Sequence, residues 1–167
     1  VLSYDLGVFN GEGINTKDRN TSKDLSARLG VRPFPGLLLS ASYYRGEYGA
    51  SYLRRVRYGA GACYDRGPVV LRGEWIGGGT GLPAGESSGW YVLGGWRATR
   101  TLMPVVRYDT FLENASAPSS RQTNYTAGIL WQPVKYLRCQ LDYTYEDYAS
   151  HGVSNRNVVA VMFSGIF

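Results

Sequence analysis

The feature that most constrains this chain is an alternation of apolar and polar residues that recurs along the whole sequence. At its C-terminal end, residues 156–167, Val159, Val161 and Phe163 share one parity and therefore one face of an extended strand. Phe167 continues that face. A stretch of about ten tilted residues is the length at which a β-strand crosses a bilayer. The sequence therefore predicts a membrane-crossing strand here.

Nine further segments share this period, and no long window favours a helical period instead. The ten predicted strands are 2–10, 24–34, 36–46, 52–65, 68–77, 88–99, 102–112, 122–132, 136–148 and 156–167. The short connections are at 33–36, 65–68, 99–101 and 132–135, and the longer ones at 11–23, 46–51, 78–87, 113–121 and 149–155. Short connections alternate with long ones, which predicts an antiparallel up-and-down β-barrel with turns at one end and loops at the other.

Within the segments, charged side chains stand on one face and apolar side chains on the other. Val106 and Tyr108, for example, oppose Arg107 and Asp109. Aromatic residues near segment ends predict the girdles that mark membrane interfaces. These residues are Tyr43, Trp75, Trp131, Tyr136 and Tyr145.

Alternation alone also suits a soluble, lipocalin-like barrel with its apolar face inside. Strand length favours the membrane barrel, since strands of soluble proteins are usually about five or six residues long. No run approaches 18 apolar residues, so a transmembrane helix is excluded, and a mean hydropathy of −0.24 is ordinary for a membrane barrel.

Charge and cysteine usage exclude other classes of function. The net charge of +5 comes from arginines spread singly along the segments, which argues against nucleic-acid binding. Cys63 and Cys139 are far apart and form no metal-binding motif, which disfavours a zinc site or a disulfide.

Several short segments give the chain a family resemblance. They are Tyr4–Gly11, Leu71–Trp75, Gly89–Val92 and Pro104–Asp109, together with Asn124–Gly128 and Leu137–Tyr143 as a penultimate hairpin. The set resembles the C-terminal half of the phosphate-selective porin O/P family. The C-terminal strand with its last aromatic residue also resembles the assembly signal of bacterial outer-membrane barrels.

This resemblance implies a barrel that is typically sixteen-stranded and trimeric, of which residues 1–167 would be one barrel segment. The alternative is a small, closed ten-stranded barrel, which an even strand number also allows. Val1 begins without the features of a secretion signal, so we expect a signal to have been removed or the start to lie inside a longer protein.

If the charged face lines water, its arginines present rigid donors that attract anions into the lumen. The predicted pore-lining residues are Arg28, Arg32, Arg55, Arg57, Arg72, Glu74, Arg97, Arg107, Asp109, Arg138, Asp142 and Glu146. Alternatively, pairs such as Arg72 with Glu74 merely satisfy a polar wall. The resemblance implies that phosphate selectivity depends also on lysines, and this chain has only three, which disfavours a phosphate site.

Three other motifs are weaker. His151 with Ser154 resembles the base and nucleophile of outer-membrane lipid A deacylases, but this segment is predicted as an external loop. The glycines of 77–81 precede no helix, so they indicate a loop hinge and not a phosphate-binding loop. Glu12 and Asp18 are candidate ligands for a divalent cation, although solvated loop acids are commoner.

The sequence therefore predicts an outer-membrane porin for passive diffusion of small hydrophilic, anionic solutes, without catalytic residues, metal or cofactor. Its expected partners are outer-membrane lipid and lipopolysaccharide, small anions such as chloride or phosphate, and further copies in a homotrimer, but not nucleic acid. The main rival is a closed ten-stranded outer-membrane barrel with an enzymatic or structural role, and a soluble ligand-binding barrel comes third.

Overall fold

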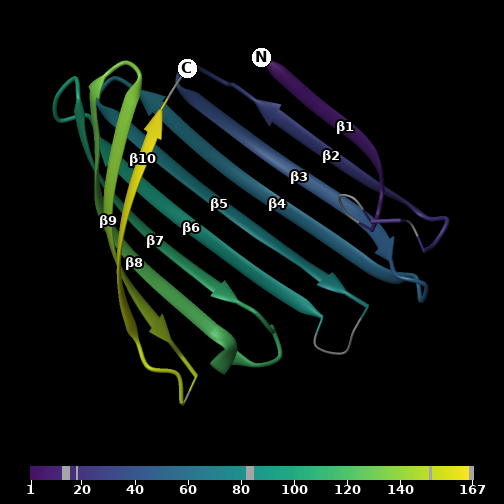
Figure 1. Ribbon diagram of the computed structural model, residues 1–167. Coiled ribbons are helices and arrows are strands. Elements are labelled where there is room, and N and C mark those ends of the chain that lie inside the picture. The colour runs from purple at the N-terminus through teal and green to yellow at the C-terminus, as the bar shows by residue number, and fades with distance from the viewer. Residues whose placement is uncertain (13–15, 18, 82–84, 151, 166–167) are drawn as a thin grey trace.

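The computed structural model describes residues 1–12, 16–17, 19–81, 85–150 and 152–165. Ten strands form a single antiparallel sheet in which each strand pairs with its neighbours in sequence order (Figure 1). The strands are β1 (Leu2–Asn10), β2 (Lys23–Val31), β3 (Leu37–Tyr48), β4 (Leu53–Arg66), β5 (Val69–Thr80), β6 (Glu86–Trp96), β7 (Leu102–Leu112), β8 (Arg121–Val134), β9 (Leu137–Tyr148) and β10 (Arg156–Gly165). A short 3-10 helix, η1 (Pro118–Ser120), precedes β8. The all-β, up-and-down prediction is confirmed.

Every predicted strand is present, but two loops were predicted too long. β3 runs to Tyr48 and β5 to Thr80, so their connections are 49–52 and 81–85. The connection 49–52 is no longer than the turn 32–36 at the opposite end, so the strict alternation of loop lengths was wrong. Gly77, Gly78 and Gly79 belong to β5 and do not form a loop hinge. Among the described residues, no helix is long and apolar enough to cross a membrane.

The sheet curls strongly at the β8–β10 side and forms an open trough (Figure 1). In the described part of the chain no ladder joins β1 to β10, so both are free edges. The sheet is therefore not closed as a ten-stranded barrel by these residues.

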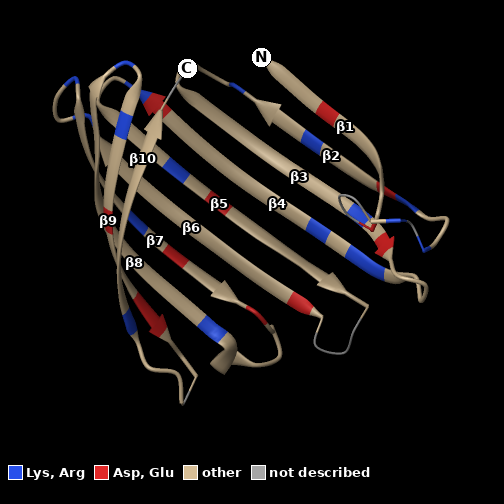
Figure 2. Ribbon diagram, in the orientation of Figure 1, with Lys and Arg blue, Asp and Glu red and all other residues tan. Residues whose placement is uncertain are grey.

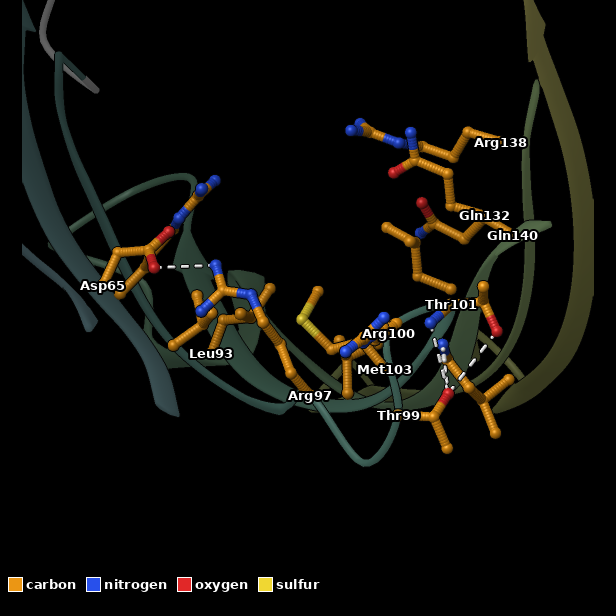
Figure 3. Close-up of a pocket in the computed structure, with 15 residues that line it drawn as sticks. Asp65, Leu93, Arg97, Thr99, Arg100, Thr101, Met103, Gln132, Arg138 and Gln140 are labelled. Carbon is orange, nitrogen blue, oxygen red and sulfur yellow. Dashed lines mark hydrogen bonds and ion pairs between the residues drawn. The ribbon is translucent and has the colours of Figure 1, made fainter. Parts of the chain in front are cut away.

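Cross-strand register keeps the two faces separate across the whole sheet. Arg107, for example, lies opposite Leu93 on β6 and Thr126 on β8, whereas its neighbour Val106 lies opposite Gly94 and Ala127. On strands β4 to β9 the side chains of the charged face point into the space that the curved sheet encloses, as Asp65 and Arg138 do in Figure 3. The charged face is thus concave and the apolar face convex.

This arrangement reverses that of a soluble barrel, whose apolar face would be enclosed. Within the described chain, Val70 is the only buried apolar side chain, at 3% exposure. Convex-face residues are open to the surroundings, with Leu6 77% and Val106 63% exposed. A single-layered sheet with an exposed apolar convex face needs lipid as its second layer.

Charges on the convex face are confined to strand ends. In the described strands they are Lys23, Arg45, Glu47, Arg54, Arg66, Glu86, Arg121 and Asp147. Figure 2 also shows charged residues in the middle of strands, and the register places these on the concave face. The band between them carries apolar side chains, as the lipid-facing belt of a membrane barrel must.

An aromatic row crosses the convex face toward the loop end. Trp90 and Tyr108 have ring centroids 5.0 Å apart, and Tyr108 and Tyr125 are separated by 5.2 Å. The row comprises Tyr43, Tyr58, Trp75, Trp90, Tyr108, Tyr125 and Tyr145. Tyr43 and Trp75 lie inside their strands and not near the ends as predicted, because β3 and β5 extend further. The row has the position and chemistry of an interfacial girdle.

Candidate functional site

The structure places most of the predicted pore-lining residues on the concave face. Ten lie within strands on that face: Arg28, Arg55, Arg57, Arg72, Glu74, Arg107, Asp109, Arg138, Asp142 and Glu146. Arg32 and Arg97 instead follow the ends of β2 and β6, in the short turns. Their environments differ, and these differences decide which side chains are available to a solute.

A cavity of about 460 Å³ lies on the concave face at the short-turn end. Figure 3 shows Asp65 and Arg97 on one wall, Arg138, Gln132 and Gln140 on the other, and Arg100 with Met103 between them. The strands β4 to β9 and the turn 97–101 supply its lining. We refer to it as the arginine cavity.

The arginine cavity holds four arginines and one acid. Arg97 donates through Nη2 to Asp65 Oδ1 at 2.7 Å and through Nη1 to the Gly67 carbonyl at 2.8 Å. Arg72, Arg100 and Arg138 also line the cavity, and no described residue accepts a hydrogen bond from their guanidinium groups. The cavity therefore carries an excess of positive charge with donors open to a ligand.

The floor of the same cavity is apolar. Leu93, Met103, Val105 and Leu130 line it from β6, β7 and β8, all on the concave face. Gly95 leaves space beside Met103 and Val105, because a β-carbon there would lie 3.3 Å from the Met103 sulfur. Polar donors and hydrocarbon thus meet in one depression.

Further toward the loop end, charged groups on the concave face are paired. In an adjoining cavity of about 350 Å³, Arg107 contacts Asp109 at 2.9 Å and stacks over the Tyr91 ring at 4.6 Å. Asn124 donates to the other oxygen of Asp109 at 2.8 Å. Arg107 and Asp109 thus form an ion pair of the kind that a satisfied polar wall would contain, whereas no ion pair joins Arg72 to Glu74.

Arg55 and Arg57 are also held by the wall. Arg57 Nη1 donates to the carbonyl oxygens of Val56 at 2.8 Å and Gly79 at 3.0 Å. The Arg55 guanidinium lies 4.3 Å from the centroid of the Tyr48 ring. Neither guanidinium is as open to a solute as the sequence pattern suggested.

Glu146 forms a second local network near the loop end of β9. Arg156 of β10 contacts its carboxylate at 2.7 Å, and the Tyr148 hydroxyl donates to it at 2.7 Å. The pairing joins the last two strands through their concave face.

The candidate cation ligand Glu12 is occupied by donors of the chain itself. Its carboxylate accepts hydrogen bonds from Gly49 N–H at 2.8 Å, Arg19 Nη2 at 3.1 Å and Asn20 Nδ2 at 3.3 Å. Burial would raise the pKa of this carboxyl, but the hydrogen bonds from Gly49 and Arg19 outweigh it and hold the pKa below the ordinary value of 4.5. Glu12 therefore ties the first loop to the connection 49–52.

The other weak candidates gain no support. Asp18, His151 and Phe167 lie outside the described residues. Among the residues that are described, no group of three or more His, Cys, Asp or Glu side chains could hold a metal ion.

The sequence pattern missed Arg100 and the apolar floor. Arg100 lies in the turn 97–101, where period two no longer applies. Leu93 and Met103 could have been found, because they share the concave parity with Arg97 and Arg107 on the same segments. Their side chains are uncharged, so a pattern of charged residues does not include them.

A lipid-facing apolar belt, an aromatic girdle and a charged concave face together define an outer-membrane barrel of the porin type. The sequence profile described as "Phosphate-selective porin O and P" matches residues 45–164, and the chain belongs to that family. The family is one of outer-membrane porins and not of enzymes.

Two similar solved structures are of a Vibrio cholerae outer-membrane protein. In-vitro folded OmpT is 13% identical, with a TM-score of 0.65 over 93% of this chain and 56% of that chain. A loop L8 deletion mutant of OmpT is 13% identical, with a TM-score of 0.63 over 96% of this chain and 59% of that chain. At this identity the likeness concerns the fold, and the present chain spans less than two thirds of either protein. No curated protein matches the chain significantly.

Proposed function

We propose that this chain forms part of the wall of an outer-membrane pore through which small hydrophilic solutes diffuse passively, with a preference for anions. The observation that carries the proposal is the arginine cavity, where Arg72, Arg100 and Arg138 have no acidic partner among the described residues. Elsewhere on the concave face Asp109 pairs with Arg107 and Glu146 pairs with Arg156, whereas in this cavity four arginines meet one acid. Such a cluster of arginines raises the local concentration of anions at this end of the pore.

We also propose that residues 1–167 are one segment of a larger barrel. The free edges of β1 and β10 support this, because an unpaired strand edge is not tolerated within the hydrocarbon layer. Coverage of 56% of the OmpT chain supports it as well. As partners we propose chloride and phosphate as permeating anions, lipid and lipopolysaccharide around the convex face, and further copies in a homotrimer.

The preference we propose is for anions in general. Of the three lysines, Lys23 lies at a strand end and Lys135 lies in a turn. Neither of these two lines the arginine cavity. The cavity relies on guanidinium groups, which bind carboxylates and other oxyanions as well as phosphate.

The test is the reversal potential of the full-length barrel in a planar bilayer under a KCl gradient. We expect a chloride-leaning potential that moves toward potassium in Arg72→Glu and Arg138→Glu. Arg66→Glu, which makes the same charge change on the convex side of the same end, should shift it less. A potassium-leaning native channel, or insertion without conductance, would contradict the proposal.

A further inference from the structure

The arginine cavity combines two chemistries that a simple ion filter does not need. Its open guanidinium groups stand beside the half-buried side chains of Leu93, Met103, Val105 and Leu130. Inorganic anions have no apolar surface to place against hydrocarbon, so this floor contributes nothing to their binding.

The charged donors that the cavity offers to a ligand are of one kind. Gln132 uses its Nε2 to bond the Lys135 carbonyl at 3.2 Å, and Gln140 uses its Nε2 to bond Asp142 at 2.6 Å. The Thr99 hydroxyl oxygen accepts from the backbone N–H groups of Thr101 and Leu102. Each amide keeps a second N–H and the Thr99 hydroxyl keeps its O–H, but these donors are neutral. The guanidinium forks are the charged anion ligands of the cavity, and a planar fork matches the two oxygens of a carboxylate.

We propose that this cavity is a subsite for organic carboxylates with an apolar body, and that it retains them in preference to inorganic anions. The carboxylate engages Arg138 or Arg72 while the hydrocarbon lies on the floor of Leu93, Met103, Val105 and Leu130. A volume of about 460 Å³ accommodates a ligand of one aromatic ring with a short acidic chain. The proposal rests on the proposed function, because the subsite lies in the pore proposed there.

The expected size of the effect follows from burial. Each methylene group removed from water improves affinity by about two- to fourfold. A phenyl group laid on the floor should therefore improve binding at least tenfold over the same acid without the ring. The comparison of 3-phenylpropionate with propionate and with phosphate isolates this term.

The experiment uses the full-length barrel in a planar bilayer in symmetric KCl, with each anion added on the short-turn side. We expect 3-phenylpropionate to halve the chloride conductance at a concentration at least tenfold below that of propionate or phosphate. The variant Met103→Gln with Leu130→Gln should lose this advantage. Ile76→Gln, a single change of the same type on the concave face outside this cavity, should retain it.

Arg138→Gln should weaken the binding of all three anions to a similar extent. Equal half-blocking concentrations for the three anions in the native barrel, or an advantage that survives in the floor variant, would overturn the subsite. Calorimetric titration of the detergent-solubilised native barrel with the same anions needs neither conductance nor a variant. It therefore separates failure of the subsite from failure of the pore.

Discussion

The Asp142 carboxylate on β9 lies against the bare backbone of Gly128 on β8, and a β-carbon on that glycine would overlap its Oδ1 atom. The same arrangement joins Asp24 of β2 to Gly46 of β3. In both places a missing side chain on one strand makes room for an acid on the next. Glycines on the concave face thus fix how close the charged side chains lie to the wall.

The variant Gly128→Ala should therefore lower the free energy of unfolding by about 1–3 kcal/mol, the usual cost of overpacking. The new methyl group forces Asp142 to move and disturbs its hydrogen bond from Gln140. Urea titration of the folded barrel in detergent measures the change. Gly94→Ala is the matched control, since a β-carbon there meets only Val106 and Leu71 at 3.7 and 3.8 Å.

A double-mutant cycle separates this contact from a general effect of alanine. Adding Asp142→Ser to Gly128→Ala should recover part of the loss, because the overlapping carboxylate is removed. Strict additivity of the two changes would show that the contact is not the cause.

Arg57 is expected to stabilise the wall more than it selects ions. Its two hydrogen bonds to carbonyl oxygens hold the guanidinium against β4 and β5. Arg57→Gln should reduce stability by about 1–3 kcal/mol, as for other charge-assisted bonds. The reversal potential of the channel should shift less in Arg57→Gln than in Arg72→Gln. A larger shift for Arg57→Gln would mean that the guanidinium projects into the lumen instead.

The tie between Glu12 and Gly49 should depend on pH in one direction. The pKa of Glu12 lies below its ordinary value of 4.5, so the folded structure favours the charged carboxylate. This stabilisation is fully present above pH 4.5 and is lost as the pH falls through the lowered pKa. Hydrogen exchange of the Gly49 amide, corrected for intrinsic rates, should show protection that weakens only in that acidic range. Glu12→Gln should weaken this protection at neutral pH, whereas unchanged protection there would refute the tie.

Neighbouring valines on β7 test the lipid-facing assignment. Val106 lies on the convex face and Val105 on the concave face. Val106→Arg should destabilise the folded barrel in vesicles by about 2–4 kcal/mol, the known cost of arginine near the bilayer midplane. Val105→Arg places the same group toward the lumen and should cost clearly less. Equal costs would contradict the orientation of the sheet.

The alternation of side chains was sufficient to predict ten strands and the face to which each residue belongs. It could not predict the ends of strands rich in glycine. Gly77–Gly79 resemble a loop in sequence, yet they continue β5 because Arg57 of the adjacent strand lies over Gly78 and donates to the Gly79 carbonyl. That interaction is non-local and leaves no periodic signal.

Parity likewise could not distinguish arginines that are open from those that are engaged. Arg57 and Arg72 occupy equivalent concave positions, but only Arg57 has carbonyl oxygens within reach. Arg100 was missed because a turn has no period to place it. The sequence pattern thus predicts which residues form the wall, whereas the cavity depends on contacts among β4 to β9.

The two native cysteines allow the most direct test of the central claim, that the concave face is wet and the convex face meets lipid. Both thiols are free; Cys63 lies opposite Arg72 on the concave face, and Cys139 lies opposite Trp131 and Phe163 on the convex face. The measurement is labelling of the full-length barrel in vesicles by a charged, membrane-impermeant thiol reagent, with Cys63→Ser and Cys139→Ser assigning each product. We expect modification of Cys63 and protection of Cys139. Labelling of Cys139 with protection of Cys63 would contradict the claim.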